Sequence, residues 1–355
     1  MRHPGFTHPF KSAGAPQSPM RLVVALGGNA ILRRGERGTA EEQFGHVRYA
    51  AANLTALVQE GHRIAITHGN GPQVGDILLK NECARETLPR MPLDVCGAES
   101  QGMLGYMIQQ SLENALRTTG IDRRVITVVT QTVVDRSDPA FSHPSKPLSG
   151  AASQTPLGLS PGGPSKPVGP FYGRSEAEQL ARTEGWAVHP VGGGMYRRVV
   201  PSPAPVRVVE ESSIRTLVDE GFIVIAAGGG GVPVVGDGSG NLSGVEAVID
   251  KDLTAGRLAT AIGAEALLIL TDVEQVSLGF GTPGERPIRE ARAAEVRAWG
   301  REGHFPEGSM GPKMDACARF VEEGGRCAIV TSLEKALDGL EGRAGTRILP
   351  DATSR

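Results

Sequence analysis

The chain lacks an excess of charge of either sign and has no long hydrophobic run. A net charge of -2 over 355 residues gives no electrostatic footprint for nucleic acid or an acidic membrane. No apolar run approaches the ~18 residues of a membrane-spanning helix, and residues 1–19 lack the apolar core of a signal peptide. These absences predict a soluble, cytoplasmic protein that binds neither nucleic acid nor membranes.

Several signatures of metal and nucleophilic chemistry are also missing. The four cysteines form no Cys-x-x-Cys pair, and the eight histidines show no His-Glu-x-x-His spacing. We therefore expect reduced, buried thiols and no metal bound by the protein itself. No Ser-His-acid or Cys-His grouping is visible either. This absence fits a nucleophile that needs no base, such as a carboxylate.

The glycine spacings do not indicate either of two common nucleotide-binding folds. No Gly-x-x-x-x-Gly-Lys-Ser/Thr occurs, which excludes a P-loop, and no Gly-x-Gly-x-x-Gly directly follows a predicted strand, which argues against a dinucleotide fold. The chain has instead three glycine-rich segments that follow predicted strands, at residues 27–28, 69–71 and 228–231. Their exposed backbone amides could hold anionic oxygens.

Lysine is scarce, because only seven of the 37 basic residues are lysines. Two of them, Lys251 and Lys313, stand at predicted helix starts, the second directly after Pro312, which we expect at the first helical position. A cation there opposes the helix dipole, and a bound anion would compensate. Each lysine alone could be an ordinary solvated charge. Together with the carboxylates Asp250 and Asp252, the pair indicates a polyphosphate held between two helices.

The order of apolar runs and helical patterns predicts an α/β fold: a three-layer sandwich with a central, mostly parallel sheet covered on both faces. A capping box at Thr39 and Glu42 marks one helix start. Small residues Ala98, Gly102 and Gly105 along a later helix predict close packing rather than ligand contact. Strands are expected at 21–26, 63–67, 125–134, 222–227, 266–273 and 327–331, and helices at 39–61, 97–116, 175–184, 210–220, 251–262 and after 313.

The alternation of strands and helices is interrupted over about residues 135–200, a stretch rich in Pro, Gly and Ser. So long an interruption predicts a small protruding lid subdomain. Within it Pro-Ser-Lys-Pro occurs twice, around Lys146 and around Lys166, and the spacer 147–163 is interpreted as a flexible insertion. Residues 1–19 are predicted to be a disordered N-terminal extension ahead of a domain over 20–355.

Seven motifs together closely resemble the carbamate kinases of the amino acid kinase superfamily, from about Met20 to Leu349. The Lys-Pro-x-Gly-Pro-Phe-Tyr and Arg-Arg-Val-Val-Pro-Ser-Pro segments are the most particular to carbamate kinases. The motifs lie at residues 25–30, 68–73, 92–102, 166–172, 197–203, 248–252 and 309–313.

The resemblance implies the reversible reaction ATP + carbamate ⇌ ADP + carbamoyl phosphate, with Mg²⁺ accompanying ATP or ADP. It further implies ATP formation in the cell, as the last step of arginine fermentation through the arginine deiminase pathway, by a homodimer. The carbamate-side lobe would comprise residues 20–220, including the protruding subdomain, and the nucleotide-side lobe residues 221–355.

The resemblance also implies roles for single residues. Lys251 and Lys313 would neutralise the phosphates, Asp252 would keep both lysines in place, and Lys166 would reach over the carbamate. Lys146 is the other candidate for this last role, but the Val168–Tyr172 segment that follows favours Lys166. Carbamate and the transferring phosphoryl group would be held by Gly27, Gly28, Asn29, Gly69, Asn70 and Gly71. The nucleotide would be bordered by Gly228, Gly229, Thr271, Asp272, Val273, Met310, Gly311 and Pro312.

Other interpretations remain open at this point. Asn29 and Asn70 could be turn formers, Asp252 a helix-start carboxylate and Asp272 the end of a strand. A kinase of the same superfamily could phosphorylate acetylglutamate or a nucleoside monophosphate, although no arginine cluster for a larger anionic acceptor lies near the first two glycine loops. A non-catalytic nucleotide-binding regulator is a further alternative, against which the set Lys251, Asp252 and Lys313 argues.

Overall fold

The computed structural model describes residues 18–33, 35–142, 146–147, 164–306 and 309–352. Residues 1–17 of the predicted N-terminal extension and 148–163 of the predicted insertion lie outside the described residues.

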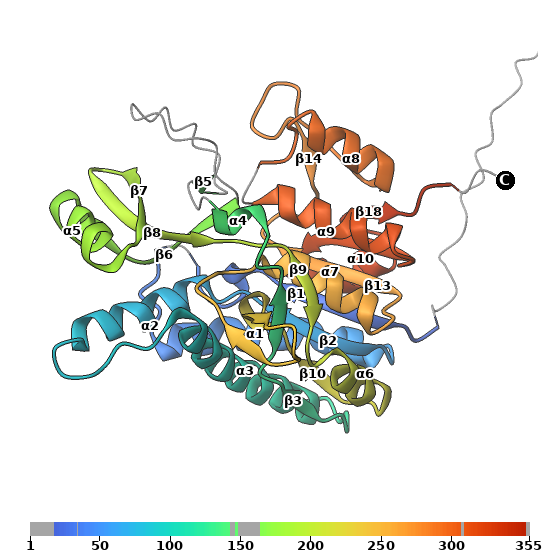
Figure 1. Ribbon diagram of the computed structural model, residues 1–355. Helices are drawn as coiled ribbons and strands as arrows, with labels where there is room; N and C mark the ends of the chain where they lie inside the picture. The colour runs from blue at the N-terminus through green and yellow to red at the C-terminus, as the bar shows by residue number, and fades with distance from the viewer. Residues whose placement is uncertain (1–17, 34, 143–145, 148–163, 307–308, 353–355) are drawn as a thin grey trace, which may run out of the picture.

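An eight-stranded sheet crosses the molecule, in the order β16-β18-β17-β13-β1-β2-β10-β3 (Figure 1). The six strands from β17 to β3 all run parallel to one another, whereas β18 runs antiparallel to β17. The bounds are β1 Arg21–Leu26, β2 Arg63–His68, β3 Val125–Thr127, β10 Ile223–Ile225, β13 Ala266–Thr271, β16 Glu290–Arg292, β17 Cys327–Ser332 and β18 Thr346–Leu349.

The sheet is mostly parallel because its central strands are apolar on both faces. In β1, Val23 and Ala25 join one hydrophobic cluster, while Leu22, Val24 and Leu26 join another on the opposite face. Strands buried on both faces read as continuous hydrophobic runs and need helices on each side. The predicted three-layer sandwich is therefore confirmed.

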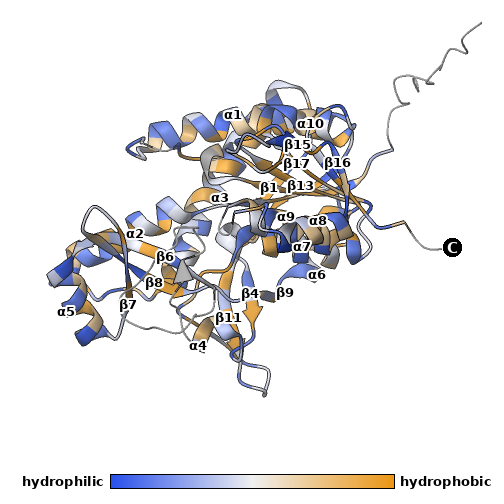
Figure 2. Cartoon of the chain, turned by 90° about the horizontal axis from the view of Figure 1, so that it is seen from above, coloured by the Kyte–Doolittle hydropathy of each residue, from blue (hydrophilic) through white to orange (hydrophobic). Residues whose placement is uncertain are grey.

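Helices cover both faces of this sheet (Figure 2). Residues of α1, α3 and α10 pack in one cluster, and residues of α6, α7, α8 and α9 pack in the other. The capping box at Thr39 and Glu42 is present at the start of α1. The bounds are α1 Ala40–Gln59, α3 Leu93–Thr118, α6 Glu211–Asp219, α7 Lys251–Ala261, α8 Ala293–Arg301, α9 Met310–Glu322 and α10 Ala336–Leu340.

The strand expected over 125–134 is wrong in one respect, because the chain forms two strands there in two different sheets. Between them the buried side chain of Gln101 accepts a hydrogen bond from the Thr130 amide at 2.9 Å and donates one to its carbonyl at 3.1 Å. Gln101 thus pairs this backbone as a neighbouring strand would. The second sheet has the order β12-β11-β4-β9, with β4 Gln131–Val134, β9 Pro205–Val208, β11 Val232–Gly236 and β12 Leu242–Gly244.

A third sheet projects to one side of the molecule beside α2, as Figures 1 and 2 both show. Its order is β5-β6-β8-β7, and we call its strands β6 to β8 with α5, residues 164–201, the protruding sheet. A small core of Tyr172, Ala177 and Leu180 holds α5 against it. The bounds are α2 Gly71–Ala84, β5 Lys146–Pro147, β6 Pro164–Gly173, α5 Arg174–Glu184, β7 Ala187–Gly192 and β8 Met195–Pro201.

Short elements complete the chain. They are α4 Pro139–Ser142, the strand pair β14 Ser277–Leu278 and β15 Arg286–Pro287, and the 3-10 helices η1 Gly28–Ala30, η2 Gly228–Gly230 and η3 Leu333–Lys335. Among the helices of the described residues, none combines the length and apolar character needed to cross a membrane.

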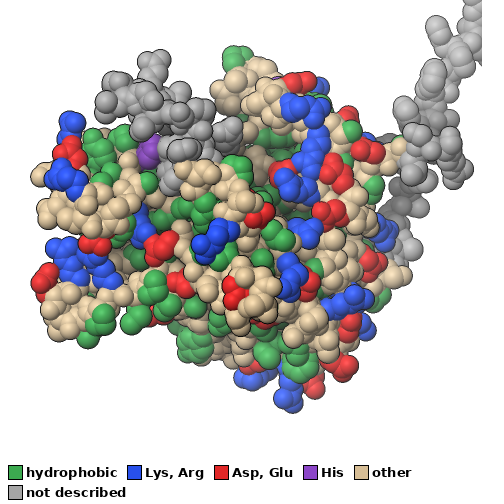
Figure 3. Space-filling model, viewed as in Figure 1, with side chains coloured by type: hydrophobic (Ala, Val, Ile, Leu, Met, Phe, Trp, Pro, Cys, Tyr) green, Lys and Arg blue, Asp and Glu red, His purple; other side chains and the backbone are tan. Residues whose placement is uncertain are grey.

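The surface mixes charges of both signs, as the net charge leads one to expect. On the face shown in Figure 3, acidic and basic side chains are interspersed over most elements. All four cysteines are free thiols, and Cys96, Cys317 and Cys327 are buried as expected. Cys83 is exposed, which corrects the expectation for that residue, because the last turns of α2 lie at the surface.

The small-residue stripe of α3 gives a test of its packing. A Cβ at Gly105 would overlap the side chain of Thr127 in β3, whereas a Cβ at Gly102 would meet nothing within 4 Å. Gly105→Ala should therefore lower the free energy of unfolding by about 1–3 kcal/mol. Gly102→Ala, the matched control, should raise it by roughly 0.5–1 kcal/mol through helix propensity. Equal effects in urea denaturation would contradict the close packing.

Candidate active site

The carboxyl ends of β1, β2 and β13 open onto two adjoining cavities, as expected for ligand sites in parallel sheets. The first has a volume of about 350 Å³ and lies under the protruding sheet. The second, about 400 Å³, lies beside the loops that follow β13 and precede α9. Both cavities are lined by Gly28, Lys251, Ser309 and Lys313. The place where they meet is therefore where the two predicted lysines converge.

The two lysines share one carboxylate. Lys251 Nζ lies 2.5 Å from Asp252 Oδ1, and Lys313 Nζ lies 3.0 Å from Asp252 Oδ2. Asp252 is only 2% exposed, so a charge that would be costly alone is compensated by two ammonium groups. The interpretation of Asp252 as a mere helix-start carboxylate does not describe this arrangement.

The start of α7 explains why Asp252 is available to the lysines. Asp250 is the N-cap, and its Oδ1 accepts hydrogen bonds from the amides of Asp252 at 2.9 Å and Leu253 at 3.2 Å. Because Asp250 caps the helix, the side chain of Asp252 need not do so.

In α9 the structure moves the helix start from Pro312 to Met310, two residues earlier than expected. Proline is tolerated there because amides of the first turn have no partner within the helix. Lys313 therefore lies at the end of the first turn, and its ammonium also donates to the Ser309 carbonyl at 3.3 Å.

A third lysine reaches the first cavity from the protruding sheet. Lys166 Nζ lies 3.0 Å from Asp250 Oδ2 and 3.4 Å from the carbonyl of Ile249. The other candidate, Lys146, pairs through its backbone with Pro164, and its side chain lies outside the described residues. Of the two, Lys166 is the one whose ammonium group the structure places at the cavity.

The charges of these groups stabilise one another. Burial works to raise the pKa of Asp250, but the neighbouring Lys166 and Lys251 outweigh it and hold that pKa well below its usual range. Burial likewise opposes the charged form of Lys313, yet the Asp252 carboxylate outweighs it and raises the pKa of Lys313. Beneath the site, burial lowers the pKa of His68 to about 4, so this imidazole is neutral near pH 7.

The glycine loops supply backbone donors. Gly69, Asn70 and Gly71 line the first cavity, and α2 begins at Gly71 with no side-chain cap, so its first amides face an anion site. Asn70 instead donates its side-chain amide to Ser100 Oγ at 2.8 Å, and this contact fixes the turn. Gly229 packs on Asn70 with a positive φ of 66°, where a side chain would overlap it.

The remaining predicted residues divide between the cavities. Thr271, Asp272, Val273 and Met310 line the second cavity, as does Gly27, which was expected on the carbamate side. Gly229 lines the first cavity rather than the second. Within the described residues Gly228, Gly311 and Pro312 line neither, and a Cβ at Gly228 would strike His68 and Gln101. The backbone of Asn29 lies in η1, and its side chain is outside the described residues.

Sequence reasoning missed several lining residues. Ser309 borders both cavities and stands in a motif that had been recognised, so that motif was its signal. Phe280, an exposed aromatic between two glycines, lines the second cavity and offered a weaker signal. His304 and Phe305 also line it, from a segment without any pattern.

Comparison with known proteins identifies the family of this chain. The sequence profile of the amino acid kinase family matches residues 20–332. The chain therefore belongs to the amino acid kinase family.

Carbamate kinases are among its relatives within that family. The carbamate kinase of Pyrococcus furiosus is 48% identical over 93% of this chain and 99% of its own length. That of Trichomonas vaginalis is 46% identical over 94% of this chain and 100% of its own. The structure of Giardia lamblia carbamate kinase bound to AMP-PNP superposes with a TM-score of 0.85, at 40% identity, and covers 94% of this chain and 99% of that one. These matches confirm the resemblance to carbamate kinases.

The carboxylate that Lys251 and Lys313 share leads to a prediction about the pKa of Lys313. Burial lowers the pKa of Lys313 and Asp252 contributes most of the attraction that outweighs it, so Asp252→Asn should lower this pKa, although Asp250 and Asp272 still attract the ammonium group. With only seven lysines in the chain, ¹³Cε NMR titration can follow each one, and Lys313→Arg assigns the signal. Asp315→Asn, two residues further along α9, is the control and should leave the pKa of Lys313 above that of an exposed lysine. An unaltered Lys313 midpoint in Asp252→Asn would rule out this coupling.

Proposed function

We propose that this chain catalyses reversible phosphoryl transfer between ATP and carbamate, forming ADP and carbamoyl phosphate. The observation that carries the proposal is the pair Lys251 and Lys313, fixed on Asp252 where a small cavity and a larger one meet. The carbamate kinase relatives support the choice of carbamate as the acceptor.

The first cavity suits a small planar acid. Besides Lys251, Lys313 and their carboxylate partners, its polar lining includes glycine-turn amides, the uncapped start of α2 and the Lys166 ammonium, which together can hold a carbamate and the phosphoryl group attached to it. The second cavity adds Phe280 and Met310, apolar surfaces of the kind on which a nucleotide base packs. Because both cavities contain Gly28, the phosphoryl group needs to move only across the loop after β1.

The reaction can be written with all bonds balanced. In the ATP-forming direction a terminal phosphate oxygen of ADP attacks phosphorus, the bond between phosphorus and the carbamate oxygen breaks, and carbamate leaves as an anion. Neither nucleophile, ADP or carbamate, has a proton to lose, so no general base is required. Positioning and neutralisation of charge do most of the work, and Lys251 and Lys313 supply the positive charge at the transferring group.

Magnesium is assigned to the nucleotide. In the described part of the chain no group of three or more His, Cys, Asp or Glu side chains is placed to hold a metal ion. Mg²⁺ in kinase sites usually keeps several waters and binds through one or two carboxylates plus phosphate oxygens, a demand that Asp272 at the edge of the second cavity could meet. When bound, the ion would neutralise charge on the phosphate oxygens.

The wider context is proposed on the same basis. We assign the ATP-forming direction in a cytoplasmic arginine deiminase pathway, in line with the carbamate kinase family, and a homodimer as the working form. Support for the dimer comes from the sheet edge at β3, near which Tyr106 of α3 is 56% exposed and Val129, two residues after β3, is 50% exposed. Light scattering should give twice the chain mass, and a monomer would remove this part of the proposal.

The proposed reaction is tested by ATP formation from ADP, carbamoyl phosphate and Mg²⁺. Lys313→Ala should lower turnover by on the order of 10²-fold or more, because it removes a charge that stabilises the transition state. Lys335→Ala is the control, since that lysine pairs with Asp338 at the surface and should not affect the rate. Absence of turnover in the wild type, or preference for acetylglutamate or a nucleoside monophosphate in a substrate panel, would contradict the proposal.

A second assay separates the two lysines of the repeated Pro-Ser-Lys-Pro segment. Lys166→Ala should raise KM for carbamoyl phosphate and lower kcat, because its ammonium is the one that lies at the first cavity. Lys146→Ala should remain close to the wild type, because the Val168–Tyr172 segment follows Lys166 and not Lys146. The reverse pattern would transfer the role to Lys146.

A further inference from the structure

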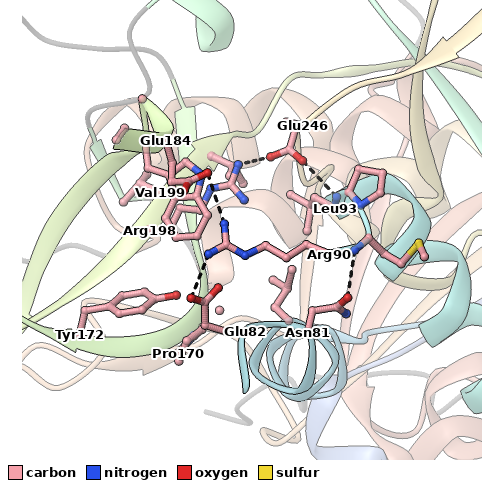
Figure 4. A pocket seen from close by; sticks show the side chains of 18 of the residues that line it. Asn81, Glu82, Arg90, Leu93, Pro170, Tyr172, Glu184, Arg198, Val199 and Glu246 are labelled. Carbon is pink, nitrogen blue, oxygen red and sulfur yellow. Dashed lines mark hydrogen bonds and ion pairs between the residues drawn. The ribbon is translucent and has the colours of Figure 1, made fainter. Parts of the chain in front are cut away.

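A further cavity, larger than either of these two, lies under the protruding sheet. It has a volume of about 560 Å³ and lies where the protruding sheet meets α2 and the start of α3 (Figure 4). It adjoins the first cavity, because Leu93 and Gly169 line both. Whatever holds its two sides together therefore also fixes the roof of the first cavity.

Two arginine ion pairs cross this junction. Arg198 of β8 is paired with Glu246, and Arg90, which precedes α3, lies 3.3 Å from Glu184 at the end of α5. Figure 4 shows Arg90 extended across the cavity between Glu184 and Glu82, the second of which it meets at 3.1 Å. Each arginine thus joins the protruding sheet to a different segment beneath it.

Trp186 lies in contact with both guanidinium groups. The Arg198 guanidinium carbon is 4.5 Å from the centre of the Trp186 ring, and that of Arg90 is 5.9 Å away. The arginine side chains are only 15% and 29% exposed, so the cation–π contacts are partly shielded from solvent, whereas the carboxylates of Glu246 and Glu184 are 46% and 38% exposed. We call Arg90, Arg198, Trp186, Glu184 and Glu246 the arginine clamp.

The clamp is connected to the active site through the backbone. In the register of β6 and β8, Arg198 is paired with Val168, and Lys166 is paired with Val200. The clamp arginine and the active-site lysine therefore lie only two residues apart along the paired strands. On the other side Glu246 lies four residues before Asp250, the carboxylate that Lys166 contacts. A backbone hydrogen bond from Val248 to the Pro201 carbonyl, 2.9 Å long, reinforces this link.

We infer that the arginine clamp positions Lys166 for phosphoryl transfer by fixing β6 and β8 against the segment 246–250. The inference rests on the proposed function and extends it to residues that do not contact the substrate bound in either cavity. It concerns the first cavity alone, because no residue of 164–201 lines the second cavity. Loss of the clamp should therefore weaken the use of carbamoyl phosphate and leave the affinity for ADP unchanged.

The test compares steady-state kinetics of four variants in the ATP-forming direction. Arg198→Gln and Glu246→Gln should each lower kcat/KM for carbamoyl phosphate about tenfold, with KM for ADP unchanged. The double variant should be no worse than either single one, because the two residues act as a pair. Arg174→Gln, which breaks an ion pair within α5 of the same protruding sheet, is the matched control and should behave as wild type.

Fluorescence gives a readout that does not depend on turnover. The chain has only two tryptophans, so Trp299→Phe leaves Trp186 as the reporter. In that background Arg198→Gln should shift the emission of Trp186, and Arg174→Gln should not.

The possible outcomes separate the two proposals. A wild type that makes no ATP overturns the proposed function and this inference with it. An active wild type with clamp variants that fold and keep kcat/KM overturns the inference alone. Equal losses with carbamoyl phosphate and ADP also overturn it, because they would show general destabilisation.

Discussion

The arrangement of the site depends on one buried carboxylate between two ammonium groups. Asp252 lies inside the protein, where an unpaired charge costs several kcal/mol. Lys251 and Lys313 compensate it from two different helices, so α7 and α9 must begin at the same place. Gly256 on α7 allows the two helices to pack closely behind that point, because a Cβ there would lie 3.3 Å from the carbonyl oxygen of Ala316 on α9.

This constraint also prepares the site for an anion. Both lysines are held in place before a phosphoryl group arrives, so little reorganisation is needed when charge develops on the transferring group. The ammonium groups of Lys166, Lys251 and Lys313 pair with two carboxylates, Asp250 and Asp252. A third carboxylate, Asp272, lines the second cavity and also attracts Lys313.

The sequence alone predicted most of the central sheet and the two lysines, because the signals for both lie within short segments of the chain. Strands such as β13 are uninterrupted apolar runs, and the start of α1 carries its capping box within four residues. It was insufficient where distant residues determine the backbone. Gln101 separates β3 from β4, and the protruding strands contain the prolines and glycines that ordinarily mark loops. The lining of the second cavity likewise joins Phe280 and His304 from separate loops.

The two cavities differ in what closes them, and this difference has a consequence for the reaction. Lys166 and Val168 of β6 form part of the first cavity, whereas the second is lined by other segments alone. The position of the protruding sheet therefore determines the enclosure of the first cavity and not that of the second. In the proposed function the first cavity holds the carbamate, and enclosure matters most there, because so small an acid offers few atoms for binding and gains affinity mainly from positioning. The protruding sheet thus lies over the cavity where positioning contributes most.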